Sequence, residues 1–285
     1  MNAIVHHYDF VTRHALHCFM QQNKVIISGS TALLALHSGM LQAKDLDLYV
    51  PIANQVAADE FLNETGYTIV GHGPDHSARE YENGWAIRVD RYAKGGKMID
   101  VVYTKGSPVR AVAEFHSTLV MNYIAWYGLV CLYPALTLDK KALINADDER
   151  ARERHERYEA RGFQFMRRHP QRPSDGPRQA CRRCFECPST VRSLFDEGVM
   201  FVPFGGVTGD LSLYEENVIW RLNNNTCGGV SPGFTAGETS ECPPHQLDKI
   251  VSDRSQVSHD DHQSKLRSRV AQGVGQNSLQ RPRER

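Results

Sequence analysis

The sequence predicts an α+β fold, in which a small mixed or antiparallel sheet is flanked by helices and followed by a helical segment. Short β-branched runs alternate with segments of helical apolar spacing through residues 1–116. Two arms, 85–92 and 98–103, flank two consecutive glycines and predict a hairpin. Large apolar residues nearly vanish from residue 223 onward, and such a segment cannot bury enough surface to offset chain entropy. The tail 223–285 is therefore predicted to be poorly ordered.

Each element is predicted from its spacing and its flanking residues. Gly66 and Gly162 are placed to end helices, and Ser107 followed by Pro108 suits a helix start. The polar, glycine-bearing stretch 71–84 predicts a loop, either an ordinary surface loop or one that overhangs an active site. The expected strands are 25–27, 45–50, 67–70, 85–92 and 98–103, and the expected helices are 6–22, 31–40, 54–63, 109–115, 119–127 and 138–161. Further on, 191–202 is expected to form a helix and a strand, and 211–222 an amphipathic piece.

Composition excludes little. The chain has 285 residues, enough for one large domain or two small ones, and its formal net charge is +0. Bulk charge therefore gives no argument for a nucleic acid or a membrane as a partner. The N-terminus lacks a basic region followed by an apolar run, so a cytoplasmic or nuclear location is expected. The uncharged run 117–138 nears the length of a membrane span, but its Asn122, Gly128 and Pro134 favour a buried core helix.

The most informative stretch is 25–50. Its first strand leads into Gly29 and Ser30 as a tight turn, and a helix then precedes the second strand. Side chains alternate along a strand, so Asp45 and Asp47 share one face while Leu46 and Leu48 share the other. Two neighbouring carboxylates on a rigid strand repel each other unless a cation lies between them. The pattern therefore favours a hard divalent metal, most often Mg²⁺.

A third carboxylate stands in an apolar strand. Asp100 lies between Ile99 and Val101, and a buried, unpaired carboxylate is costly, so a functional or paired role is favoured. Two interpretations remain open. Asp100 either belongs to the same site as Asp45 and Asp47 or is a structural residue paired with Arg88 or Arg91. Asp90, in the preceding arm, is the rival candidate.

The ordered combination resembles the DNA polymerase β-like nucleotidyltransferase superfamily, and within it the AbiEii-type toxin nucleotidyltransferases. Their pattern runs from Gly-Gly-Thr-Ala-Leu to Asp-Leu-Asp. Here Ser28-Gly29-Ser30-Thr31-Ala32-Leu33 precedes Asp45-Leu46-Asp47, with a gap slightly longer than usual. The resemblance covers residues 24–161 and implies a nucleotidyltransferase fold. Without it, the glycine and serine form a plain turn and the aspartates an exposed strand edge.

The resemblance implies transfer of a nucleoside monophosphate from a nucleoside triphosphate (NTP) to a hydroxyl acceptor, with two Mg²⁺ ions. It assigns metal binding and catalysis to Asp45, Asp47 and Asp100, and contact with the triphosphate to Gly29 and Ser30. Lys140 or Lys141 would neutralise the β and γ phosphates. The family's later Arg/Lys–Asp pair has no match after the arginines of 150–154. A nucleotide-binding pseudoenzyme is therefore an alternative, and the acceptor, with RNA as one candidate, stays open.

The expected organisation has four parts: a nucleotidyltransferase-like core (1–116), a helical segment completing the domain (117–169), a cysteine-containing appendage (170–222) and the tail (223–285). Cys181, Cys184 and Cys187 have zinc-like spacing but need a fourth ligand. The choice lies between structural Zn²⁺ and free thiols or a disulfide. A further alternative is an interaction protein that binds RNA through the arginine-rich stretch 150–183 and these cysteines.

Overall fold

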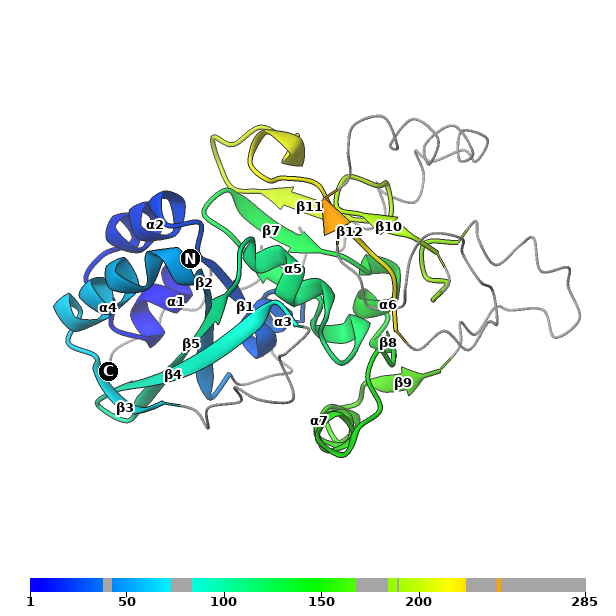
Figure 1. Cartoon of the computed structure of the whole chain (residues 1–285), viewed down its shortest axis with the longest axis horizontal. Coiled ribbons are helices and arrows are strands. Elements are labelled where there is room, and N and C mark those ends of the chain that lie inside the picture. The colour runs from blue at the N-terminus through cyan, green and yellow to red at the C-terminus, as the bar shows by residue number, and fades with distance from the viewer. Residues whose placement is uncertain (38–42, 73–83, 168–183, 189, 224–239, 242–285) are drawn as a thin grey trace, which may run out of the picture.

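The computed structural model describes residues 1–37, 43–72, 84–167, 184–188, 190–223 and 240–241 (Figure 1). Several sequence predictions lie outside the described residues. They concern Cys181, most of the loop predicted at 71–84, and nearly all of the tail predicted from residue 223 onward.

A mixed sheet of eight strands forms the centre of the fold, in the order β11-β7-β6-β1-β2-β5-β4-β3. Only β2 and β5 run parallel to each other among these described neighbours, and the remaining pairs are antiparallel. The strands are β1 (Ile26–Ser28), β2 (Asp45–Pro51), β3 (Thr68–His72), β4 (Ala86–Lys94), β5 (Lys97–Thr104), β6 (Asn122–Ile124), β7 (Gly128–Cys131) and β11 (Met200–Pro203).

Helices cover both faces of this sheet. The α-helices are α1 (Asn2–His7), α2 (Arg13–Gln22), α3 (Gly29–Leu36), α4 (Gln55–Glu64), α5 (Pro108–Ala113), α6 (Pro134–Leu138) and α7 (Glu149–Glu159). Figure 1 shows α1, α2 and α4 grouped together, with α7 well apart from them. The three grouped helices bury their apolar sides against Leu46, Leu48 and Val101. Helix α5 packs on the opposite face, where Tyr49 and Val102 lie. The predicted fold class, a mixed sheet flanked by helices, is confirmed.

Two smaller sheets complete the structure. One has the order β10-β12-β13, formed by Arg192–Ser193, Val218–Trp220 and Ser240–Glu241, and the other pairs β8 (Lys141–Leu143) with β9 (Gln164–Met166). Short 3-10 helices occur at Ile52–Asn54, Thr118–Val120 and Leu211–Leu213.

The predicted hairpin is present. Strands β4 and β5 pair from Ala86↔Thr104 to Lys94↔Lys97. Gly95 and Gly96 form the turn with φ of +55° and +80°, a region that glycine adopts without steric cost.

The prediction of a buried helix over 119–127 was wrong. This stretch forms a 3-10 turn followed by β6, and β7 comes next, so the apolar run lies at the centre of the sheet. Asn122 helps to place it there, because its backbone carbonyl accepts a hydrogen bond from Ser28 Oγ at 2.6 Å. A strand buried on both faces has no polar alternation, so its sequence cannot be told from that of a buried helix. No helix in the described part of the chain has the length and apolarity that a bilayer span requires.

The prediction of one long charged helix over 138–161 was also wrong, because this range is divided among several elements. Helix α6 ends at Leu138, β8 follows, and α7 starts after Asp148, whose side chain accepts from Ala151 N at 3.0 Å. Lys140 has φ +59°, which cannot continue a right-handed helix. The predicted stop at Gly162 is confirmed, since this residue has φ +88° just after α7.

Other boundaries differ in a similar way. The expected helix 6–22 is two helices, with Asp9 at φ +49° between them and Thr12 capping the second. Of the helix and strand expected over 191–202, only the strand is present as β11, preceded by the two-residue β10. The segment 117–169 also contains strands, so it is not the purely helical segment that was expected.

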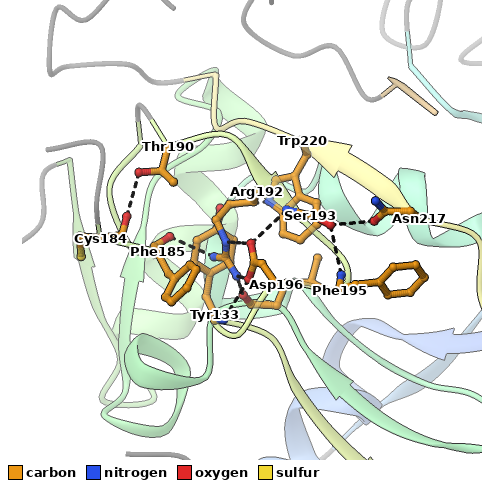
Figure 2. Close-up of polar contacts among 12 residues, drawn as sticks. Tyr133, Cys184, Phe185, Thr190, Arg192, Ser193, Phe195, Asp196, Asn217 and Trp220 are labelled. Carbon is orange, nitrogen blue, oxygen red and sulfur yellow. Dashed lines mark hydrogen bonds and ion pairs between the residues drawn. The ribbon is translucent and has the colours of Figure 1, made fainter. Parts of the chain in front are cut away.

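The described part of 170–222 is built into the fold and does not form an appendage. Strand β11 pairs with β7. The side chain of Arg192 lies among Tyr133, Asp196 and Trp220 (Figure 2). The Arg192 guanidinium binds both carboxylate oxygens of Asp196 at 2.7 and 2.9 Å and lies 4.6 Å from the centre of the Tyr133 ring. The Trp220 ring centre lies 5.3 Å from the same guanidinium, so aromatic rings and the partner carboxylate surround the charge.

Candidate functional site

Three carboxylates from neighbouring strands gather on one face of the sheet. Strands β2 and β5 are parallel, and Asp47 is the register partner of Asp100. Asp45 lies two residues before Asp47 on the same face, whereas Leu46 and Leu48 belong to the core on the other face. Asp45 and Asp47 are partly exposed and Asp100 is buried. The pairing of β2 with β5 therefore brings together the three aspartates that the sequence singled out.

The turn between β1 and α3 approaches these carboxylates very closely. Ser28 is the register partner of Asp47, and Gly29 follows with φ +64°. A Cβ atom at Gly29 would lie 2.1 Å from Asp47 Oδ2, a distance that no real Cβ tolerates. Glycine is required here both by the backbone conformation and by the space. Gly29 and Ser30 both line the cleft that the aspartates enter, so the beginning of α3 borders it.

Arg91 forms an ion pair with the third carboxylate, that of Asp100. Its Nε and Nη2 donate to Oδ1 and Oδ2 of Asp100, each at 2.7 Å, a two-pronged pair between register partners on β4 and β5. The two interpretations of Asp100 are therefore both met in part. Asp100 pairs with Arg91, and it also lies beside Asp47. Asp90 is engaged elsewhere, by Arg88 Nη2 and His72 Nδ1, each at 2.9 Å, and does not line the cleft.

The cleft has a volume of about 690 Å³ and three chemically distinct parts. Its acidic residues are the aspartate trio together with Glu114 and Asp148. Its apolar part is formed by Tyr49, Val89, Val102, Ala111, Phe115 and Val120. Its cationic part consists of Lys44, Arg91, Arg150, Arg154, Arg157 and Arg161. A ligand with a flat apolar group and several negative charges would match the apolar and cationic parts, and a divalent cation would join it to the acidic part.

The aspartates are only partly neutralised. Burial, together with the charges of Asp45 and Asp100, raises the pKa of Asp47 to about 7, against the opposing charges of Arg91 and Arg154. His116 also lines the cleft, and burial lowers its pKa to about 3, so the ring is neutral near pH 7. The electrostatics of the trio therefore favour an added cation.

Four arginines form a row along the cleft. Arg150, Arg154 and Arg157 occupy positions i, i+4 and i+7 of α7, which lie on one face of a helix, and Arg161 follows just after its end. We call these four residues the arginine row. Glu153 and Arg157, which are spaced to pair on a helix, form no ion pair with each other. The spacing was the available signal, but only the fold shows that this face turns toward the aspartates.

The two lysines predicted to contact phosphates are not brought to the site. Lys140 lies in the turn after α6, and Lys141 opens β8 opposite Gln164. Neither is among the described residues that line the cleft. The cationic role that the resemblance gave to them is available instead to Arg91 and the arginine row, which the sequence prediction did not include.

The implied Mg²⁺ fits the residues in part. Within the described ranges, no group of three or more His, Cys, Asp or Glu side chains is arranged to hold a metal ion. Both carboxylate oxygens of Asp100 accept hydrogen bonds from Arg91. Asp45 and Asp47 remain as two carboxylates on one face, a donor set that suits a hard divalent cation. Asp100 would join them only if Arg91 shared or released it.

The cysteines give no support for zinc within the described part of the chain. Cys184 Sγ donates to Glu186 Oε2 at 2.7 Å, and Cys187 is buried. Burial raises the pKa of the Cys184 thiol to about 12, which disfavours the thiolate that zinc binds. Because Cys181 lies outside the described residues, structural zinc stays a prediction.

Comparisons with known proteins identify no family. No protein-family model matches the sequence, and no curated protein matches it. Among solved structures, the chain is similar to a tRNA-processing enzyme in its apo form I, with a TM-score of 0.39 and 13% sequence identity. The match covers 55% of this chain and 45% of that enzyme, so this chain spans less than half of its length. A likeness at this level assigns neither a family nor an activity.

Proposed function

We propose that this protein transfers a nucleoside monophosphate from an NTP to a hydroxyl acceptor with the assistance of Mg²⁺. The observation that carries the proposal is the meeting of Asp45, Asp47 and Asp100 in register at a cleft bordered by Gly29 and Ser30. The cationic and apolar parts of the same cleft support it, because an NTP has a polyanionic end and an apolar base.

Each part of the cleft has a role in this proposal. Gly29 lets the backbone approach the triphosphate, and Ser30 offers N–H and O–H donors at the positive end of α3. Lys44 and Arg91 offset the phosphate charge, and the apolar part of the cleft holds the base. Asp45 and Asp47 hold Mg²⁺, which when bound offsets charge on the phosphate oxygens.

In the proposed reaction one bond to phosphorus forms and another breaks. The acceptor oxygen forms a bond to the α-phosphorus, the bond from that phosphorus to the bridging oxygen breaks, and pyrophosphate leaves. Asp100, held in place by Arg91, lies beside the other two carboxylates and accepts the proton of the acceptor hydroxyl.

The test uses the full chain with labelled NTPs, Mg²⁺ and a panel of hydroxyl acceptors. Asp45→Asn and Asp47→Asn should each lower pyrophosphate release by about 100-fold or more, because each removes a charge from the site. Asp210→Asn is the control, since Asp210 is an exposed carboxylate in the 3-10 turn far along the chain. Unchanged turnover by either site variant contradicts the proposal.

A second candidate, a nucleotide-binding pseudoenzyme, is favoured by one observation. Arg91 occupies both oxygens of Asp100, and the described residues offer no ready three-ligand metal site. Calorimetry that detects NTP binding to the wild-type chain, with no pyrophosphate released over the acceptor panel, would select this candidate.

A further inference from the structure

The arginine row is longer than the binding of a triphosphate requires. Arg150 and Arg157 are seven residues apart on α7, about 10 Å along the helix axis, and Arg161 extends the row beyond the end of the helix. Across the cleft, Ser30, Lys44 and Arg91 already stand at the aspartate side. The cationic surface therefore continues past the place where a triphosphate would meet the carboxylates.

The middle of this row is not offset by an ion pair within the described ranges. Arg154 and Arg157 are exposed and form no ion pair with any carboxylate in the described ranges. Arg152, which lies on a different side of the helix, is by contrast paired with Asp147 at 3.0 Å. Glu149, Glu156 and Glu159 lie off the arginine face at 3.6 residues per turn, whereas Glu153 lies at its edge. Arginines therefore predominate on the face that α7 turns to the cleft, where its N-cap Asp148 also lies.

The row also reaches the reaction centre. Arg154 lowers the pKa of Asp47 through its charge, so the two residues lie within electrostatic range of each other. Tyr158, whose ring lies 5.4 Å from the Arg161 guanidinium, lines the cleft beside the row together with His116. A series of cations with aromatic rings alongside is the combination that binds a nucleic-acid strand, through its phosphates and its bases.

Resting on the proposed function, we propose that the arginine row binds the backbone of a single-stranded nucleic acid whose terminal hydroxyl is the acceptor. A strand places a phosphate at every nucleotide, so one strand can engage several arginines in succession. A small-molecule or single-residue protein acceptor has no repeated anion that would use this length. The terminal hydroxyl of a strand bound along α7 is directed to the aspartates, because both line one cleft.

Anisotropy of a labelled oligonucleotide tests this inference directly. The full chain, without metal or NTP, is titrated with a 15-nucleotide RNA at several salt concentrations. The double variant Arg154→Gln/Arg157→Gln should bind at least about tenfold more weakly, and its salt slope should fall by about 1.4 because two phosphate contacts on a single strand are lost. Arg152→Gln removes the same charge from a different side of the helix and should bind like the wild type. Circular dichroism confirms folding of the variants, since all three side chains are exposed.

Further arms separate this inference from the proposed function. Asp47→Asn should keep oligonucleotide binding while it loses transfer, because Asp47 contributes no positive charge to the row. Equal binding of RNA and DNA, or a preference for RNA, supports the inference and identifies whether the 2′-hydroxyl is read. If the arginine double variant loses NTP binding and keeps oligonucleotide binding, the row is a triphosphate site and the inference is overturned. A wild-type chain that binds RNA but transfers nothing contradicts the proposed function and the acceptor role, and leaves only the binding face.

Discussion

At the scale of single residues, the site depends on one close approach. Gly29 lies where a side chain would collide with Asp47, and the collision would involve the carboxylate itself, which is partly exposed in the cleft. Any residue with a Cβ must therefore displace either the turn or the carboxylate. Because Asp47 is also the register partner of Asp100, such a displacement would disturb the whole trio.

Gly29→Ala should destabilise the chain by about 2–4 kcal/mol, from the positive φ together with the forced displacement. It should also lower the rate of nucleotide transfer by more than the loss of folded protein accounts for. Chemical denaturation and pyrophosphate release measure the two effects.

The matched control is Gly95→Ala. Gly95 has φ +55°, close to that of Gly29, but its Cβ would meet nothing within 4 Å. This variant should show only the backbone cost, about 1–2 kcal/mol, and keep its transfer activity. Equal losses for the two variants would contradict a special role for the contact with Asp47.

At the scale of elements, a buried ion pair fastens the segment after residue 184 to the main sheet. The side chain of Arg192 is 0% exposed and that of Asp196 is 6% exposed. Arg192 also donates to the carbonyls of Phe185 and Leu132, each at 3.0 Å, which links three stretches of the chain at one guanidinium. Asp196 in turn accepts from Ser193 N and Gly198 N, so it shapes the loop between β10 and β11.

Asp196→Ala should cost about 3–5 kcal/mol of unfolding free energy, because it leaves the buried guanidinium without its carboxylate. Hydrogen exchange should show loss of protection first in β10 and β11. Asp147→Ala removes a partly exposed carboxylate that pairs with Arg152 and Arg167 and should cost much less. A small loss in Asp196→Ala, equal to that control, would show that the pair does not anchor the segment.

At the scale of the whole molecule, buried titratable groups make stability depend on pH in opposite directions. Burial raises the pKa of Glu215 to about 7 from an ordinary value of 4.5, so the folded chain holds a proton that the unfolded chain releases. This contribution is complete below about pH 4.5 and is lost as the pH rises through 7. His116 acts in the other direction, because its lowered pKa removes stability as the pH falls below 6.5.

Glu215→Gln should flatten the fall in stability between pH 5 and pH 8. The amide cannot ionise, so the variant should avoid a loss of about 1–3 kcal/mol that the wild type undergoes across this range. Denaturation at pH 5, 6, 7 and 8 measures the slope. Glu216→Gln, at the exposed neighbour, should keep the slope of the wild type. Identical slopes for all three proteins would contradict a buried, protonated Glu215.

Local patterns were enough to predict a large part of the site. The order of strand, glycine turn, helix and Asp-x-Asp strand appears as β1, α3 and β2, and the two-glycine turn appears between β4 and β5. The shared face of Asp45 and Asp47 follows from the two-residue period of a strand alone. The predicted element types and boundaries were wrong where the apolar residues had no clear period. This happened in β6 and β7, which are buried on both faces.

The sequence by itself thus determined which residues alternate on β2 and where the chain turns, because these features depend on neighbours along the chain. Only the tertiary structure decided that β5 pairs with β2, which sets Asp100 opposite Asp47, and that Arg91 engages it. The structure alone also turned the arginine row toward the cleft and left Lys140 and Lys141 outside it. Register and helix orientation are fixed by packing between distant segments, and short-range patterns carry no record of that packing.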